Sequence, residues 1–98
     1  MSEPLSADVI RTALANLPGW SGGPTGLTRS FKFPNFLTAI AFMQAAAPAI
    51  DAGNHHPEWA NVYNRVSVTL RTHDAGDRVT MLDVTLARLL DAEAAKHG

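Results

Sequence analysis

The sequence contains no cysteine, which excludes disulfide bonds, thiolate metal ligands and thiol nucleophiles. It also has little excess of charge of either sign, because eight Lys and Arg residues stand against nine Asp and Glu residues. Since nucleic acid is attracted by a concentrated positive field, we expect no nucleic-acid partner. Any catalysis by this chain must therefore rest on oxygen and imidazole groups.

Long hydrophobic runs are also absent. The longest weakly polar stretch, residues 39–50, is interrupted by Gln44 and Pro48 and is shorter than the roughly 20 residues that span a bilayer. The opening residues 1–5 lack the basic and apolar regions of a secretory signal. We therefore expect no membrane association and a cytoplasmic location.

The composition is typical of one small globular domain, with 46% hydrophobic and 17% charged residues in 98. A chain of this size buries only about 60–68% of the surface that its unfolded form exposes, so self-association would add to its stability. We predict a single domain over residues 1–98.

Hydrophobic spacing predicts three helices. The first begins after Ser6, its N-cap, and stops at Pro18-Gly19, and the second spans residues 36–50. We expect the second helix to bend or end at Pro48, which removes a backbone hydrogen bond. The third begins after Thr80, which forms a capping-box pair with Asp83.

Alternation of polar and apolar residues predicts four strands, two of them around a turn cluster at residues 21–26 and two over 58–63 and 65–73. Asn64 is expected to take a positive φ in the tight turn between the last two strands, and Arg29 is a polar exception on an apolar face. The connections are too short for parallel crossovers. We therefore predict an α+β fold of order α-β-β-α-β-β-α, in which a four-stranded antiparallel sheet carries three helices on one face.

Three of the four histidines lie within residues 55–73. His55 and His56 are adjacent in a loop, and His73 is predicted on the polar face at the far end of a strand, which a hairpin can bring back to the loop. Imidazole both accepts and donates protons near neutral pH, so the three side chains suit acid/base chemistry. His97 is expected in a frayed tail without a role.

Structural roles and a metal site are the alternatives for these residues. Taken singly, each histidine can be a structural residue, Asp83 a helix cap and Asp74 a turn residue. The two adjacent histidines could also form a zinc site with Asp51 or Asp74, although neighbouring histidines rarely direct both rings at one ion.

A spaced pattern joins many of these residues: His55-His56-Pro57-Glu58-Trp59, Asn61-Val62-Tyr63-Asn64, Val66, Leu70, Thr72-His73-Asp74 and Asp83. It resembles the pattern of the pterin-4a-carbinolamine dehydratases, and the likeness extends upstream over nearly the whole chain. The resemblance implies three helices against a four-stranded antiparallel sheet, and a homodimer or homotetramer. Some animal members also bind a homeodomain transcription factor, a role for which this sequence gives no indication.

The resemblance implies dehydration of the 4a-hydroxytetrahydropterin that aromatic amino-acid hydroxylases release, giving quinonoid dihydropterin and water in tetrahydropterin recycling. The pterin is the substrate, and no metal or other cofactor is implied. By the same resemblance, His55, His56 and His73 are catalytic, with the roles of acid and base left open. The residues implied to bind the pterin are Asp51, Asn54, Arg71, Thr72, Asp74 and Asp83.

The chain departs from the family pattern at three places. Asp51 stands where Glu is common, Pro48 is unusual near the end of its helix, and the segment between His73 and Asp83 is one residue longer, with Asp77-Arg78 where Gly is usual. A dehydratase-like binding or assembly module with weak or no catalysis is therefore the alternative function. The three histidines favour the enzyme, because a scaffold does not need clustered imidazoles.

Overall fold

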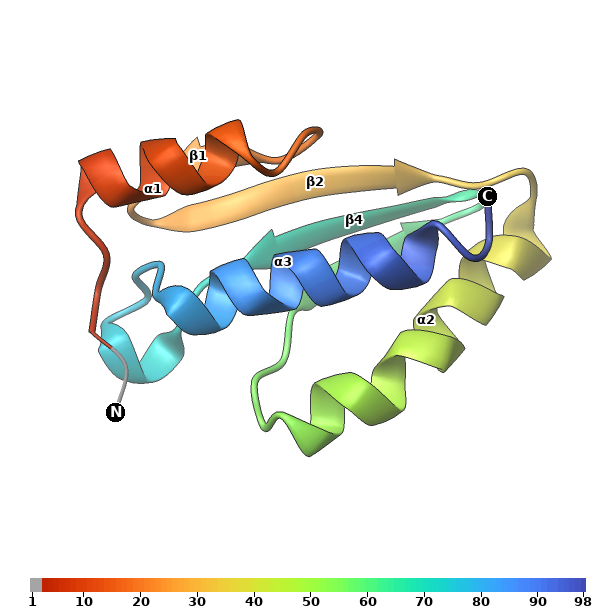
Figure 1. Cartoon of the computed structure of the whole chain (residues 1–98). Helices are drawn as coiled ribbons and strands as arrows, with labels where there is room; N and C mark the ends of the chain where they lie inside the picture. Colours follow the sequence, from red (N-terminus) through yellow and green to blue (C-terminus); the bar gives the residue numbers. More distant parts are fainter. Residues whose placement is uncertain (1–2) are drawn as a thin grey trace.

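The computed structural model describes residues 3–98, so Met1 and Ser2 of the predicted 1–98 domain lie outside the described residues. Its elements are α1 (Ala7–Ala15), β1 (Ser21–Gly23), β2 (Gly26–Lys32), α2 (Phe36–Ala52), β3 (Glu58–Val62), β4 (Arg65–Leu70), the 3-10 turn η1 (His73–Ala75) and α3 (Met81–Ala94) (Figure 1). The predicted α-β-β-α-β-β-α order is confirmed.

The four strands form one antiparallel sheet in the order β1-β2-β4-β3. The register places Leu27 opposite Leu70 and Phe31 opposite Val66, and these four side chains are buried in the core. Because side chains alternate along a strand, Thr28, Ser30, Ser67 and Thr69 lie on the outer, polar face of the sheet. The helices cover the apolar face, as the sequence predicted (Figure 1).

The ends of the helices follow from capping. Ser6 accepts a hydrogen bond from the Val9 amide at the start of α1, and Thr80 and Asp83 form the predicted capping box at the start of α3. The second helix was predicted to bend or end at Pro48, and it does not end there, because α2 continues to Ala52. Ile50 is buried in this last turn, so core packing offsets the hydrogen bond that proline removes.

The turn between β3 and β4 differs from the prediction, since the residue with positive φ is Tyr63 (φ 51°) and not Asn64. Asn64 is held instead by Phe33, the residue after β2, because its side-chain amide donates to the carbonyl of Phe33 at 2.9 Å and its own carbonyl accepts from the Phe33 amide at 2.8 Å. Tertiary hydrogen bonds therefore override the local preference of asparagine for left-handed backbone.

Arg29, the polar exception on the apolar face, joins the sheet to α3. Its Nη1 donates to Oδ1 of Asp91 at 2.9 Å, and the guanidinium carbon lies 4.4 Å from the centre of the Phe31 ring. The same Asp91 oxygen accepts from the indole N–H of Trp20 at 2.8 Å. One carboxylate thus satisfies two partly buried donors from two segments of the chain.

The residues after α3 pack against the core. His97 is not frayed as predicted, since its Nε2 lies 3.0 Å from a Glu93 oxygen and its ring packs edge-on against Phe42. Among residues 3–98, no helix has both the length and the apolar character to cross a membrane.

We predict that Asp91→Ala lowers the free energy of unfolding by about 1–3 kcal/mol, because it leaves the Trp20 indole N–H without its acceptor and leaves Arg29 Nη1 with only the Pro18 carbonyl. Urea unfolding measures this loss. The control is Asp8→Ala, which breaks a fully solvated contact with Arg11 at 2.8 Å and should cost only about 0.5 kcal/mol. Equal losses of unfolding free energy in the two variants would contradict the role of Asp91 as the shared acceptor of Trp20 and Arg29.

Candidate functional site

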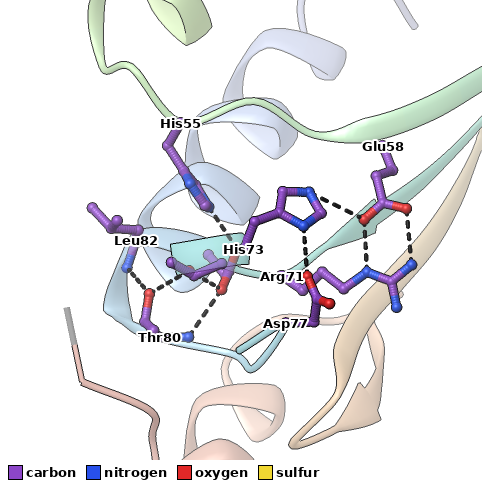
Figure 2. A network of polar contacts seen from close by, with 9 residues as sticks. His55, Glu58, Arg71, His73, Asp77, Thr80 and Leu82 are labelled. Carbon is purple, nitrogen blue, oxygen red and sulfur yellow. Dashed lines mark hydrogen bonds and ion pairs between the residues drawn. The ribbon is translucent and has the colours of Figure 1, made fainter. Parts of the chain in front are cut away.

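His55 is fixed by a buried carboxylate. The chain leaves α2 through Gly53 and Asn54, whose positive φ of 50° redirects the backbone, and His55 then points toward the start of α3 (Figure 2). Its Nε2 lies 2.6 Å from Oδ1 of Asp83. The His55 side chain is 14% exposed and that of Asp83 is 0% exposed, so the histidine lies between the carboxylate and solvent.

The second oxygen of Asp83 is bound from two other segments. Oδ2 accepts from the Thr72 hydroxyl at 2.9 Å and from the Thr80 amide at 2.9 Å, and the two threonine hydroxyls lie 2.7 Å apart. Thr72 and Asp83 were predicted to bind the pterin, but both are buried. Of the two, Asp83 contacts His55, and Thr72 contacts Asp83.

A second cluster surrounds His73. Its Nδ1 lies 2.6 Å from an Asp77 oxygen, and its Nε2 lies 3.6 Å from Oε2 of Glu58. Arg71 donates to both oxygens of Glu58, from Nε to Oε2 at 2.6 Å and from Nη2 to Oε1 at 2.9 Å (Figure 2). This cluster is considerably more exposed than the pair of His55 and Asp83.

The position of His73 corrects the prediction that it ends a strand. Strand β4 stops at Leu70, and the amides of Ala75 and Gly76 then donate to the carbonyls of Thr72 and His73 to form η1. Positive φ at Gly76 and Asp77 turns the chain back. The Asp77 carboxylate therefore returns to the histidine four residues before it.

Arg71 and Glu58 shift each other's pKa. The hydrogen bond from Arg71 holds the pKa of Glu58 below its ordinary value of 4.5, with a smaller opposing effect from burial. The same hydrogen bond to Glu58 raises the pKa of Arg71. Glu58 thus stays an anion beside His73 over a wider range of acid pH than a free glutamate.

His56 lies apart from the other two histidines. The two adjacent histidines line different pockets. His55 lines an apolar pocket of about 250 Å³ between α2 and α3, whereas His56 lines one of about 520 Å³ with Pro57 and Trp59. Among residues 3–98, no hydrogen bond or ion pair joins His56 to His55 or His73.

The remaining predicted residues are distributed unevenly. Asp51 reaches Nε2 of His56 at 3.1 Å, so the shorter side chain at this position still contacts a histidine. Asn54 and Asp74 are exposed. Within the part of the chain that the structure describes, no three His, Asp or Glu side chains are grouped to hold a metal ion.

Glu58, Asp77 and Thr80 were not among the predicted site residues, although the sequence gives some indication of their positions. The register pairs Glu58 with Thr69, which makes Arg71 its diagonal neighbour on the outer face of the sheet. Asp77 lies four residues after His73, and Thr80 was noticed only as a cap. Their roles depend on contacts that no local pattern specifies.

We predict that Glu58 titrates below pH 4.5 in the folded protein and that Arg71→Gln raises its pKa toward 4.5. The pKa is depressed on folding, so the stability that Glu58 contributes is present above its unfolded pKa and is lost as pH falls through the folded one. Carbon-13 NMR of the carboxyl groups measures both values. Arg65→Gln, a change of charge elsewhere on the outer face, should leave the pKa of Glu58 unchanged, and an equal effect would contradict the assignment to Arg71.

Comparisons with known proteins agree on the family. The family model for pterin 4 alpha carbinolamine dehydratase matches residues 3–93. A relative from Rhizobium etli, provisionally named a pterin-4-alpha-carbinolamine dehydratase, is 46% identical over 98% of this chain and 96% of its own length.

Two solved structures extend the comparison. The crystal structure of a transcriptional coactivator/pterin dehydratase from Brucella melitensis has a TM-score of 0.86 and 47% identity, covering 92% of this chain and 97% of that one. A pterin dehydratase-like protein that is a RuBisCO assembly factor in the alpha-carboxysome has a TM-score of 0.62 and 25% identity over 76% of this chain and 86% of its own. On the match of residues 3–93 and these identities, the chain belongs to the pterin-4a-carbinolamine dehydratase family.

Proposed function

We propose that this protein dehydrates a 4a-hydroxytetrahydropterin to the quinonoid dihydropterin and water, in the cytoplasm, after an aromatic amino-acid hydroxylase has released the substrate. The observation that carries the proposal is His55, held at 2.6 Å by a buried carboxylate in a chain of this family. A histidine oriented in this way is the group that acid/base catalysis requires.

The reaction is balanced by proton transfers alone. The bond between the ring carbon and its hydroxyl group breaks with the electron pair on oxygen, which takes a proton and leaves as water. The neighbouring ring nitrogen loses its proton to a base, and the freed electron pair forms the C=N bond. No electron is gained or lost overall, so we propose that the reaction needs no metal or redox cofactor.

His55 and His73 are the proposed centres of this chemistry. Asp83 connects them, because it hydrogen-bonds both to His55 and to Thr72, the residue before His73. His56 would act from the pocket that it shares with Trp59. Arg71, Asn54, Asp51 and Asp74 remain the proposed contacts of the pterin ring.

The alternative function is a dehydratase-like module for binding or assembly. The observation in its favour is the likeness to a pterin dehydratase-like protein that serves as a RuBisCO assembly factor. A module of this kind does not require a histidine held by a buried carboxylate, which favours the enzyme. Activity measurements separate the two functions.

We predict that the protein accelerates the ultraviolet absorbance change of freshly formed 4a-hydroxytetrahydropterin over the rate in buffer. His55→Ala and His73→Ala should each lower kcat by about 10²–10⁴-fold, since each removes a proton-transfer group. His97→Ala, which changes a histidine that contacts Glu93 and Phe42 and belongs to neither histidine cluster, should retain the rate.

Two outcomes would overturn the proposal. A double variant of His55→Ala and His73→Ala that turns over like the wild type would exclude these histidines from catalysis. No acceleration by folded wild-type protein at micromolar concentration would favour the assembly module instead.

We also propose that the protein is a homodimer or homotetramer. Apolar side chains on the outer face of α2 are exposed, with Leu37 76% and Phe36 45% accessible, and such patches usually mark contacts with a partner. Light scattering should give a multiple of the 10.5 kDa chain mass, and Leu37→Glu should shift the equilibrium toward the monomer. A wild-type monomer at micromolar concentration would contradict self-association.

A further inference from the structure

The hydrogen bonds around Asp83 have a fixed direction. A carboxylate only accepts, so the hydroxyl proton of Thr72 is directed to Oδ2 of Asp83 at 2.9 Å. That proton is the only one the Thr72 hydroxyl has, and the 2.7 Å contact between the two hydroxyls must therefore use the proton of Thr80. The oxygen of Thr80 accepts in turn from the Leu82 amide at 3.2 Å. This Thr80–Thr72–Asp83 chain begins at the first turn of α3 and ends on the carboxylate.

Asp83 is also the acceptor in its hydrogen bond with His55. Its Oδ2 already accepts from the Thr72 hydroxyl and the Thr80 amide, and the positive end of the α3 dipole favours a negative charge at this position. Imidazole binds a proton roughly a few hundredfold more tightly than a carboxylate in peptides. The proton in the 2.6 Å contact therefore belongs to Nε2 of His55.

The other ring nitrogen of His55 remains unoccupied by hydrogen bonding. Among residues 3–98, Nδ1 has no hydrogen-bond partner, and no buried side-chain nitrogen or oxygen in these residues lacks one. Nδ1 is therefore accessible to solvent, and its ring lines the pocket formed with Met81 and Leu82. In neutral His55 this nitrogen carries the lone pair.

We infer that Asp83, held in place by Thr72 and Thr80, selects the tautomer of His55, so that Nδ1 is the base that takes the proton from the pterin ring nitrogen. Thr80, Thr72 and Asp83 are then positioning residues, because they act only through His55. On accepting the proton, His55 becomes a cation hydrogen-bonded to the Asp83 carboxylate, which stabilises the charge formed in the reaction. The catalytic part of this inference rests on the proposed function, whereas the tautomer does not.

The tautomer is measured directly by long-range proton–nitrogen NMR of protein labelled with nitrogen-15 histidine, with His55→Ala identifying the signals. The wild type should show Nε2 protonated and Nδ1 unprotonated in neutral His55. In Asp83→Asn the amide oxygen keeps the Thr72 and Thr80 donors and the NH₂ group faces His55, so the proton should move to Nδ1. The kcat of this variant should fall about 10²–10⁴-fold with KM little changed.

Threonine variants separate positioning from a purely structural role. Thr80→Val removes the hydroxyl that donates to Thr72 and should lower kcat about tenfold by loosening the position of Asp83, whereas Thr80→Ser restores the rate. The proton of neutral His55 should stay on Nε2 in both variants, because the carboxylate is unchanged. Thr38→Val is the matched control, since the Thr38 hydroxyl also serves a helix cap, where it donates to Asn35 at 2.8 Å, but belongs to α2. It should leave the His55 signals and kcat unchanged. Circular dichroism establishes that each variant is folded.

The outcomes distinguish the two proposals. A wild-type His55 with its proton on Nδ1, or an Asp83→Asn variant that keeps the proton on Nε2, overturns this inference even if the protein is an active dehydratase. The expected tautomer in a folded protein without dehydratase activity overturns the proposed function, and with it the role of Nδ1 as base. Both the tautomer shift and the loss of kcat in Asp83→Asn support the inference.

Discussion

The structure depends on the need to satisfy one carboxylate that has been removed from water. An ionised side chain buried without donors would cost several kcal/mol, and Asp83 is fully buried. Its donors come from the end of β4, the start of α3 and the loop after α2, where Thr72, Thr80 and His55 lie. Satisfying this one group therefore brings together three segments of the chain and leaves a histidine at the surface between them.

The two histidine clusters follow different physical rules. His55 is held by a partner shielded from solvent, so salt screens this contact much less than an exposed one. His73 is held by exposed groups, Asp77 and Glu58, and by the bidentate contact of Arg71 with Glu58. Exposed ion pairs of this kind contribute little to stability. We therefore regard the first cluster as the rigid part of the site and the second as the adaptable part.

Much of the fold follows from the sequence, because helix caps, apolar spacing and alternation are local signals. The Ser6 cap and the Thr80–Asp83 box are read directly from neighbouring residues. The predictions from local sequence were wrong where tertiary contacts outweigh local preference. Burial of Ile50 allows α2 to continue beyond Pro48, and hydrogen bonds with Phe33 keep Asn64 out of the left-handed conformation. The spaced histidine motif indicated the site, but the contact of His55 with Asp83 spans 28 residues and cannot be deduced from spacing.

The late position of Asp83 in the chain has a consequence for folding. All the histidines of the motif precede α3, yet His55 finds its partner only when that helix has docked against the sheet. A partly folded chain that has formed the sheet but not yet docked α3 would have the complete motif and a freely rotating His55 ring. Local opening of α3, which needs less free energy than global unfolding, would abolish this arrangement while most of the core persists. The proposed chemistry is thus coupled to the docking of the last helix.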